Sequence, residues 1–161
     1  MKIALIYPEV YDIARFYGKR KEFPPFGILY LASILENNNF NIQLFTVDAN
    51  NTKLDLRDFD VIAFSIPSSI TYNIIKSVRK NSDIHKDSLL IAGGVHPTIF
   101  PKETLVDLEV DVVGVGQGDE TIIEIMENYK SKNFTKIAGI YYMKDNETIH
   151  TEPRKLKRDY S

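Results

Sequence analysis

Two bare glycines followed at once by a histidine are the first feature of this sequence that suggests chemistry. The stretch LLIAGGVHPTIF (residues 89–100) begins as an apolar run and stops at Gly93 and Gly94. Because glycine has no side chain, a flat ligand or another stretch of backbone could approach closely there. A tight turn that needs a positive φ angle explains the pair equally well. His96 could be a ligand, a base or a wall residue bonded to backbone.

Two other apolar runs also end in small or polar residues. SIPSSIT (65–71) places four hydroxyl groups where the chain would enter a helix, and helix capping accounts for only one or two of them. GVGQGDET (114–121) spaces its glycines as G-x-G-x-G, which is not the G-x-G-x-x-G dinucleotide fingerprint. Asp119 and Glu120 would also repel a pyrophosphate there, so nicotinamide dinucleotide binding is disfavoured.

Several common chemistries lack their usual residues. The chain has no cysteine, which excludes disulfides, thiolate catalysis, thiolate-bound zinc and iron–sulfur clusters ligated by this chain. The histidines at 85 and 150 have no suitable neighbours in sequence, so we expect surface positions for both and no metal site built by protein alone. The motifs of P-loop nucleotide hydrolases and of serine hydrolases are absent.

The elements that would position these residues alternate between strands and helices. Five short apolar runs predict strands at 2–7, 41–47, 60–66, 88–93 and 110–115. Amphipathic patterns predict helices at 27–38, 70–81 and 119–131. The pattern predicts an α/β fold with a doubly wound, mainly parallel five-stranded sheet of flavodoxin or Rossmann type. Two alternating runs around residues 144–147 predict a C-terminal β-hairpin appended to that sheet.

In doubly wound sheets, ligands bind beyond the carboxyl ends of the strands. Three of those ends lack bulky side chains, and together they predict a slot for something long and partly flat. The small residues of the slot are Ser65, Gly93, Gly94, Gly116 and Gly118. The long connection 8–26 mixes aromatic residues with prolines, and we expect it to close over the ligand.

Length and charge are those of one soluble domain without a nucleic-acid partner. The chain has 161 residues, of which 43% are hydrophobic and 26% charged, and its formal net charge is −2. No basic field would attract nucleic acid or a membrane surface. The N-terminal apolar run is too short for a signal peptide or a membrane span, so a cytoplasmic location is expected.

At this point the motifs resemble those of a known family. The chain is similar to the N-terminal cobalamin-binding domain of the B12-dependent radical S-adenosylmethionine (SAM) enzymes, which include methyltransferases and the anaerobic magnesium-protoporphyrin monomethyl ester cyclase type. The resemblance covers essentially the whole chain, although family members often have glutamate at 117 and 119. Its marks, in order, are IALIYP (3–8), PPFGILYLA (24–32), DVIAFSIPSS (60–69), AGGVHPT (92–98), VDVVGVGQGDE (110–120) and the hairpin GIYYMKDNETIHTEPRKL (139–156).

The resemblance implies a cobalamin site in the predicted slot. The dimethylbenzimidazole tail of cobalamin would insert between the sheet and its helices, and the 8–26 connection would contribute to the corrin side. The residues implied along the tail and the corrin edge are Ser65, Pro67, Ser68, Ser69, Gly93, Gly94, His96, Pro97, Gly116, Gln117 and Gly118.

Departures from related patterns sharpen what the resemblance implies. Other cobalamin domains carry D-x-H-x-x-G, whose histidine ligates cobalt, whereas DIARFYG (12–18) has Ala14 at that place. The resemblance therefore implies base-off cobalamin with no protein histidine on the metal. The SAM and 4Fe–4S chemistry would belong to a C-terminal radical SAM domain or to a separate catalytic polypeptide. Residues 1–153 would form the cobalamin-binding domain, and 154–161 would begin a linker.

Two functions of other classes stay open from the residues alone. A signalling domain on a flavodoxin-like sheet would need acidic phospho-acceptors after the first strand, where only Glu9 and Asp12 stand, and a lysine after the fifth. A flavin or nucleotide domain would use the turn at 65–71 as a phosphate site, and flavin retained after purification would reveal it.

Overall fold

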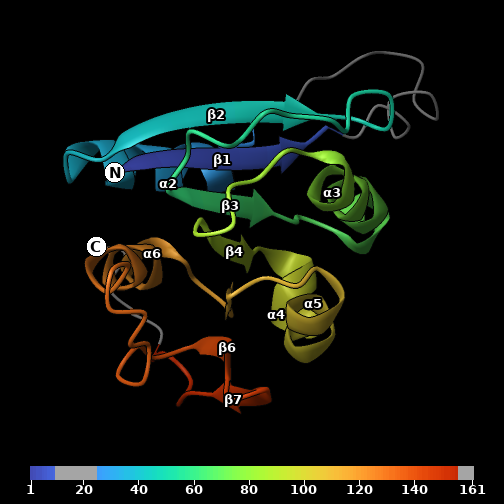
Figure 1. The fold of residues 1–161 in the computed structure, drawn as a ribbon. Coiled ribbons are helices and arrows are strands. Elements are labelled where there is room, and N and C mark those ends of the chain that lie inside the picture. The colour runs from blue at the N-terminus through green and yellow to red at the C-terminus, as the bar shows by residue number, and fades with distance from the viewer. Residues whose placement is uncertain (10–24, 156–161) are drawn as a thin grey trace.

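The computed structural model describes residues 1–9 and 25–155, which form a single sheet with helices on both faces (Figure 1). The strands are β1 (Lys2–Pro8), β2 (Asn41–Val47), β3 (Val61–Ser65), β4 (Leu89–Gly93), β5 (Val112–Gly114), β6 (Ile140–Lys144) and β7 (Glu147–His150). The helices are α2 (Phe26–Asn37), α3 (Ser69–Asn81), α4 (Val95–Ile99), α5 (Pro101–Asp107) and α6 (Asp119–Glu127).

The sheet has the order β2-β1-β3-β4-β5-β6-β7, and its first five strands are parallel. Strands β6 and β7 continue the same sheet in antiparallel fashion. The predicted doubly wound parallel sheet with a C-terminal hairpin is thereby confirmed. The register places Ser65 beside Gly93, so two of the small residues singled out in the sequence lie at the same level of the sheet.

Strands β1, β3 and β4 are buried and apolar on both faces because each face is covered by helices. On one face, Ile3 and Leu5 of β1 belong to a core cluster that includes residues of α2 and α6. On the other face, Ala4 and Ile6 pack in a second cluster with residues of α3 and α5. Figure 1 shows the helices distributed over the two faces of the sheet. The alternation of β1 thus directs its side chains into two separate cores.

The hairpin predicted around residues 144–147 closes with a two-residue turn. Asp145 and Asn146 both have positive φ angles, of 50° and 65°. A turn with two positive φ angles matches the right-handed twist of paired strands, and aspartate and asparagine tolerate that conformation better than most residues. The polar residues between the two alternating runs therefore specify a tight connection between β6 and β7.

The helices differ from the sequence prediction in two places. The segment after β4 forms two short helices, α4 and α5, which the periodicity of apolar residues did not indicate because five and seven residues span too few turns. Helix α6 ends at Glu127 rather than near residue 131. No helix in the described ranges is long and apolar enough to cross a membrane.

Arg154 fastens the segment after β7 to α6. Its side chain is 15% exposed, its Nη1 lies 2.9 Å from Glu120 Oε2, and it also pairs with Glu124. Its Nε donates a hydrogen bond of 2.9 Å to Thr121 Oγ1. These contacts hold the end of the hairpin segment against the helix that borders the slot described below.

Replacing Arg154 with alanine is expected to lower the free energy of unfolding by about 2 kcal/mol, because a largely buried, charge-assisted network is lost. Urea denaturation measures this difference. Arg57→Ala is the matched control, since the pair of Arg57 with Asp55 is mostly exposed and screened by solvent and should contribute much less. Equal losses in the two variants would contradict a special role for Arg154.

Candidate functional site

A cavity of about 600 Å³ opens on the α2–α6 face of the sheet, at the carboxyl ends of the central strands. Residues of β1, β3, β4 and β5 form its sheet side, and residues of α2 and α6 form its helix side. Its lining consists of Leu5, Gly27, Ile28, Tyr30, Leu31, Ala63, Phe64, Ser65, Ile91, Ala92, Gly93, Gly94, Gly114, Gly116, Gln117, Gly118, Asp119, Thr121, Ile122 and Ile125. We call this cavity the slot.

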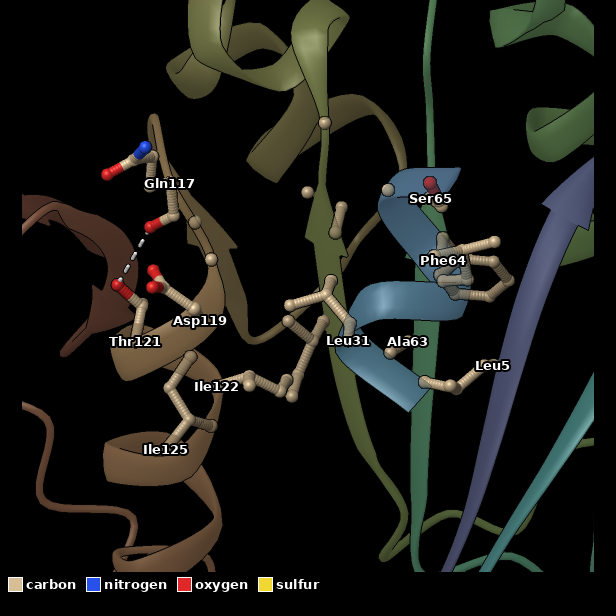
Figure 2. Close-up of a pocket in the computed structure, with 18 of the residues that line it drawn as sticks. Leu5, Leu31, Ala63, Phe64, Ser65, Gln117, Asp119, Thr121, Ile122 and Ile125 are labelled. Carbon is tan, nitrogen blue, oxygen red and sulfur yellow. Dashed lines mark hydrogen bonds between the residues drawn. The ribbon is translucent and has the colours of Figure 1, made fainter. Parts of the chain in front are cut away.

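The interior of the slot is aliphatic. Figure 2 shows Leu31 on α2, Ile122 and Ile125 on α6, and Leu5 and Ala63 on neighbouring strands. Leu31, Ile122 and Ile125 belong to the apolar stripes of the helices predicted at 27–38 and 119–131, and the sequence did not place them at a site. The available signal was the apolar stripe on each of α2 and α6, because both helices pack on the same face of the sheet.

Gly93 leaves space open in the slot. A Cβ atom added to Gly93 would meet nothing within 4 Å, and its backbone conformation is not the left-handed one that favours glycine. Any side chain there would point into unfilled volume beside Ile91, which lines the slot from the same strand. The absence of a side chain at Gly93 therefore creates room for a ligand and is not required by a turn.

Gly94 has a different role. Its φ angle is 115°, and an added Cβ would lie 2.6 Å from the carbonyl oxygen of Ile66. Real Cβ atoms do not approach a backbone oxygen so closely, so this position requires glycine to let the β4–α4 turn pass the end of β3. Of the two explanations that the sequence left open, the tight turn applies to Gly94, whereas Gly93 leaves open space beside its strand.

The turn between β5 and α6 also borders the slot. Gly116 has a φ angle of 80°, and a Cβ there would meet nothing within 4 Å. A Cβ on Gly118 would lie 3.5 Å from Leu31 of α2, which is ordinary van der Waals contact. Glycine is therefore needed at 116 for its backbone conformation. Because Gly116 has no side chain, nothing from this residue projects into the slot.

Polar groups gather at the mouth of the slot. Ser65, Gln117 and Asp119 line it, and the hydroxyl of Thr121 donates to the carbonyl oxygen of Gln117 over 3.4 Å (Figure 2). The slot thus combines an apolar interior with polar residues at its rim. Small-molecule and cofactor sites commonly have this composition, and their volumes commonly lie between about 300 and 1,000 Å³.

Six of the eleven site residues proposed from the sequence line the slot. These are Ser65, Gly93, Gly94, Gly116, Gln117 and Gly118. The other five do not: Pro67, Ser68, Ser69, His96 and Pro97. The reason is local, because the chain leaves β3 and β4 toward α3 and α4 and so carries these residues away from the α2–α6 face.

His96 lies behind the slot, among aromatic residues. Its ring stacks on Tyr72 with 4.2 Å between centroids and is tilted against Phe100, and it is only 9% exposed. Its Nδ1 lies 2.9 Å from Ser69 Oγ. Burial lowers the pKa of His96, which favours the neutral imidazole. The imidazole therefore lies outside the lining of the slot, packed on aromatic rings and next to the Ser69 hydroxyl rather than bonded to backbone.

The remaining sequence expectations fall outside the slot. His85 and His150 are exposed, as predicted, and do not border the slot. The central part of the connection 8–26, residues 10–24, lies outside the described residues, and so does Ala14. Among the residues that the structure does describe, no group of three or more histidine and carboxylate side chains could hold a metal ion.

A doubly wound sheet with a cavity at the carboxyl ends of its parallel strands defines a ligand-binding domain of Rossmann-like architecture. Comparison with protein families is more specific. Residues 20–126, well over half of the chain, match the B12 binding domain. This chain therefore belongs to the B12-binding domain family.

Two curated relatives match nearly the whole chain. It is 22% identical over 173 aligned positions to the anaerobic magnesium-protoporphyrin IX monomethyl ester cyclase of Cereibacter sphaeroides, with 99% of this chain and 28% of that protein covered. It is 28% identical over 163 positions to a putative methylthiotransferase of Methanocaldococcus jannaschii, with 96% and 30% covered. The chain thus spans less than a third of the length of these relatives.

Solved structures share the fold at low sequence identity. The radical SAM methyltransferase TsrM from Kitasatospora setae, with cobalamin and a [4Fe–4S] cluster bound, superposes with a TM-score of 0.68 at 13% identity, over 99% of this chain and 30% of that one. The cobalamin-dependent SAM radical enzyme OxsB, with aqua-cobalamin bound, gives 0.63 at 13% identity, over 96% and 22%. The module resembles those of B12-dependent radical SAM enzymes.

Proposed function

We propose that this chain binds cobalamin in the base-off state and holds the nucleotide tail of the cofactor in the slot. In this proposal the chain is the cofactor module of a B12-dependent radical SAM methyltransferase or cyclase and has no catalytic activity by itself. Membership of the B12-binding domain family supports the choice of ligand. The alternative domains, for signalling or for flavin, have no comparable support.

The observation that carries the proposal is the fit between the slot and a flat, elongated group. The slot is open where a side chain at Gly93 would stand, and its interior is formed by aliphatic residues such as Ala63 and Ile122. The tail of cobalamin ends in an aromatic, largely apolar base, and burial of that base in an aliphatic cavity is favourable. The polar rim around Ser65 and Gln117 suits the more polar part of the tail.

In the proposal no protein histidine ligates cobalt, and the positions of the histidines support this part of it. The chain has three histidines, at 85, 96 and 150, and none of them lines the slot. His85 and His150 are exposed, and His96 packs against Tyr72 and Phe100. Ala14 stands where related cobalamin domains have their cobalt-ligating histidine. A tail buried in the slot would at the same time hold the dimethylbenzimidazole away from the metal.

The proposal assigns catalysis to a partner domain or polypeptide. Bound cobalamin would supply a cobalt centre for methyl-transfer or radical chemistry, and the residues of this chain would bind and orient it. Without cysteine, the chain cannot ligate a 4Fe–4S cluster through thiolates. In the proposal, the cluster and SAM belong to a radical SAM domain, either C-terminal or on a separate polypeptide, and the remaining length of the relatives leaves room for one.

The test is to add hydroxocobalamin to the purified chain, remove free cofactor by desalting and record the visible spectrum. We expect retained corrinoid with a base-off spectrum. A base-on spectrum would contradict insertion of the tail. Loss of all corrinoid, with flavin retained from purification instead, would replace the proposal by the flavin alternative.

A further inference from the structure

We propose that His96 and Thr98 are positioning residues that set the shape of the slot from behind. Together they connect the three turns that border it, after β3, β4 and β5. Both stand on α4, a helix of five residues directly after the glycine pair. The inference rests on the proposed function, because the quantity that these residues control is the affinity for the corrinoid.

Thr98 links the turn after β5 to the turn after β4. The backbone N–H of Gly116 donates to Thr98 Oγ1 over 3.0 Å, and the same hydroxyl donates to the carbonyl oxygen of Gly94 over 2.8 Å. One hydroxyl thus joins two of the glycines that line the slot. The Gly94 oxygen also accepts from the backbone N–H of Thr98, so loss of the hydroxyl would leave only the Gly116 N–H without this partner.

His96 links the turn after β4 to the turn after β3. Its backbone N–H donates to the carbonyl oxygen of Ile66 over 3.1 Å, and its Nδ1 lies 2.9 Å from Ser69 Oγ at the start of α3. The backbone N–H of Ile66 in turn donates to the Gly93 oxygen over 2.8 Å. The imidazole is held by its stack on Tyr72, so the turn after β3 is fastened to a rigid side chain.

The two links act on the same region of the slot from opposite directions. Gly94 lies between them, in contact with Ile66 on one side and bonded to Thr98 on the other. A change in either link would shift the backbone of Gly93 or Gly116, and both of these residues border the slot directly. Hydrogen bonds that fix backbone around a preformed site lower the entropy lost on binding.

The position of α4 suits this role better than a role in the core. Val95 and Ile99 are 58% and 60% exposed, so two of its five side chains contribute little apolar burial. Besides the burial of Pro97, α4 provides the two hydrogen-bonded links, one through the buried imidazole of His96 and one through the hydroxyl of Thr98. These links account for His96 and Thr98 directly after the glycine pair, although neither residue lines the slot.

Thr98→Val tests the inference, because valine keeps the shape of threonine and removes only the hydroxyl. We expect the Kd for hydroxocobalamin to rise about tenfold and the amide of Gly116 to exchange with solvent faster. Thr98→Ser restores a hydroxyl and should restore both. Ser69→Ala should likewise weaken binding, since it removes the partner of His96 and leaves the stacked rings in place.

Thr104→Val is the matched control. Thr104 Oγ1 donates to the carbonyl oxygen of Phe100, the residue before α5. The bond spans four residues, as the bond of Thr98 to Gly94 does, but Phe100 does not line the slot. We expect unchanged affinity in this variant, at a melting temperature no higher than that of Thr98→Val. Equal affinity of Thr98→Val and the unmodified chain would overturn the inference, as would equal losses in Thr98→Val and Thr104→Val.

The outcomes also separate this inference from the proposed function. If the unmodified chain binds no corrinoid, the proposed function fails, and so does the inference about affinity. If it binds corrinoid and the variants at 69 and 98 bind equally well, only the inference fails. Exchange at Gly116 is measured without ligand, so unchanged exchange in Thr98→Val contradicts the link itself whatever the chain binds.

Discussion

Gly94→Ala is expected to lower the free energy of unfolding by about 3 kcal/mol. The added methyl group would lie 2.6 Å from the Ile66 oxygen and 2.9 Å from the Ile66 carbonyl carbon, both of them backbone atoms that cannot rotate away. The residue would also have to keep a φ angle of 115°, which side-chain-bearing residues rarely adopt. Strain at such a backbone position costs of order 1–3 kcal/mol, and the clash adds to it.

The neighbouring glycine provides the control. Gly93→Ala adds the same methyl group one residue earlier, where nothing lies within 4 Å and no left-handed conformation is needed. We expect this variant to unfold within about 0.5 kcal/mol of the unmodified chain. Urea or thermal denaturation of both variants measures the difference, and equal stabilities would mean that the turn can relax away from Ile66.

The fold could be predicted from the sequence because its signals are local and repeated. Strands β1, β3 and β4 lie in clear apolar runs, and the longer helices α2, α3 and α6 have buried apolar residues at helical spacing. Helices α4 and α5 could not be predicted in the same way. They are short, and Pro97 and Pro101 interrupt the pattern, so their formation depends on contacts with the neighbouring turns rather than on periodicity.

The site could be predicted only in part, because residues close in sequence diverge in space at the end of a strand. Ser65 and Gly93 were located correctly, since the carboxyl ends of parallel strands meet at one edge of the sheet. Ser69 and His96 were placed beside them, but the first turn of each following element directs them to the other face. No property of single residues shows this direction, which the angle between strand and helix determines.

The aliphatic interior of the slot was missed for a related reason. Ile122 and Ile125 form part of an ordinary apolar stripe, and a stripe that packs against a sheet has the same sequence as one that leaves a cavity. The difference lies in the strands opposite, where Gly93 carries no side chain to fill the space. Predicting the cavity would have required the register of α6 against β4, which depends on the whole fold.

The largest effect on function is expected from Gly93→Leu. The leucine side chain would extend into the slot from its floor, toward the volume beside Ile91 and Ala63 that the tail of the cofactor would occupy. Because the backbone at this position accepts a side chain without strain, we expect little change in stability. The Kd for hydroxocobalamin should rise at least a hundredfold, which corresponds to about 2.7 kcal/mol.

A leucine added elsewhere separates filling of the slot from the general effect of a larger apolar surface. Gln43 is exposed on the edge strand β2 and does not line the slot, so Gln43→Leu should bind corrinoid as the unmodified chain does. Titration of the three proteins, followed by the visible spectrum, measures the affinities. Undiminished base-off binding by a folded Gly93→Leu would place the nucleotide tail elsewhere. Loss of affinity in Gly93→Leu alone would locate the tail beside β4. Gly93 ends the apolar run of that strand, although its backbone conformation does not require glycine.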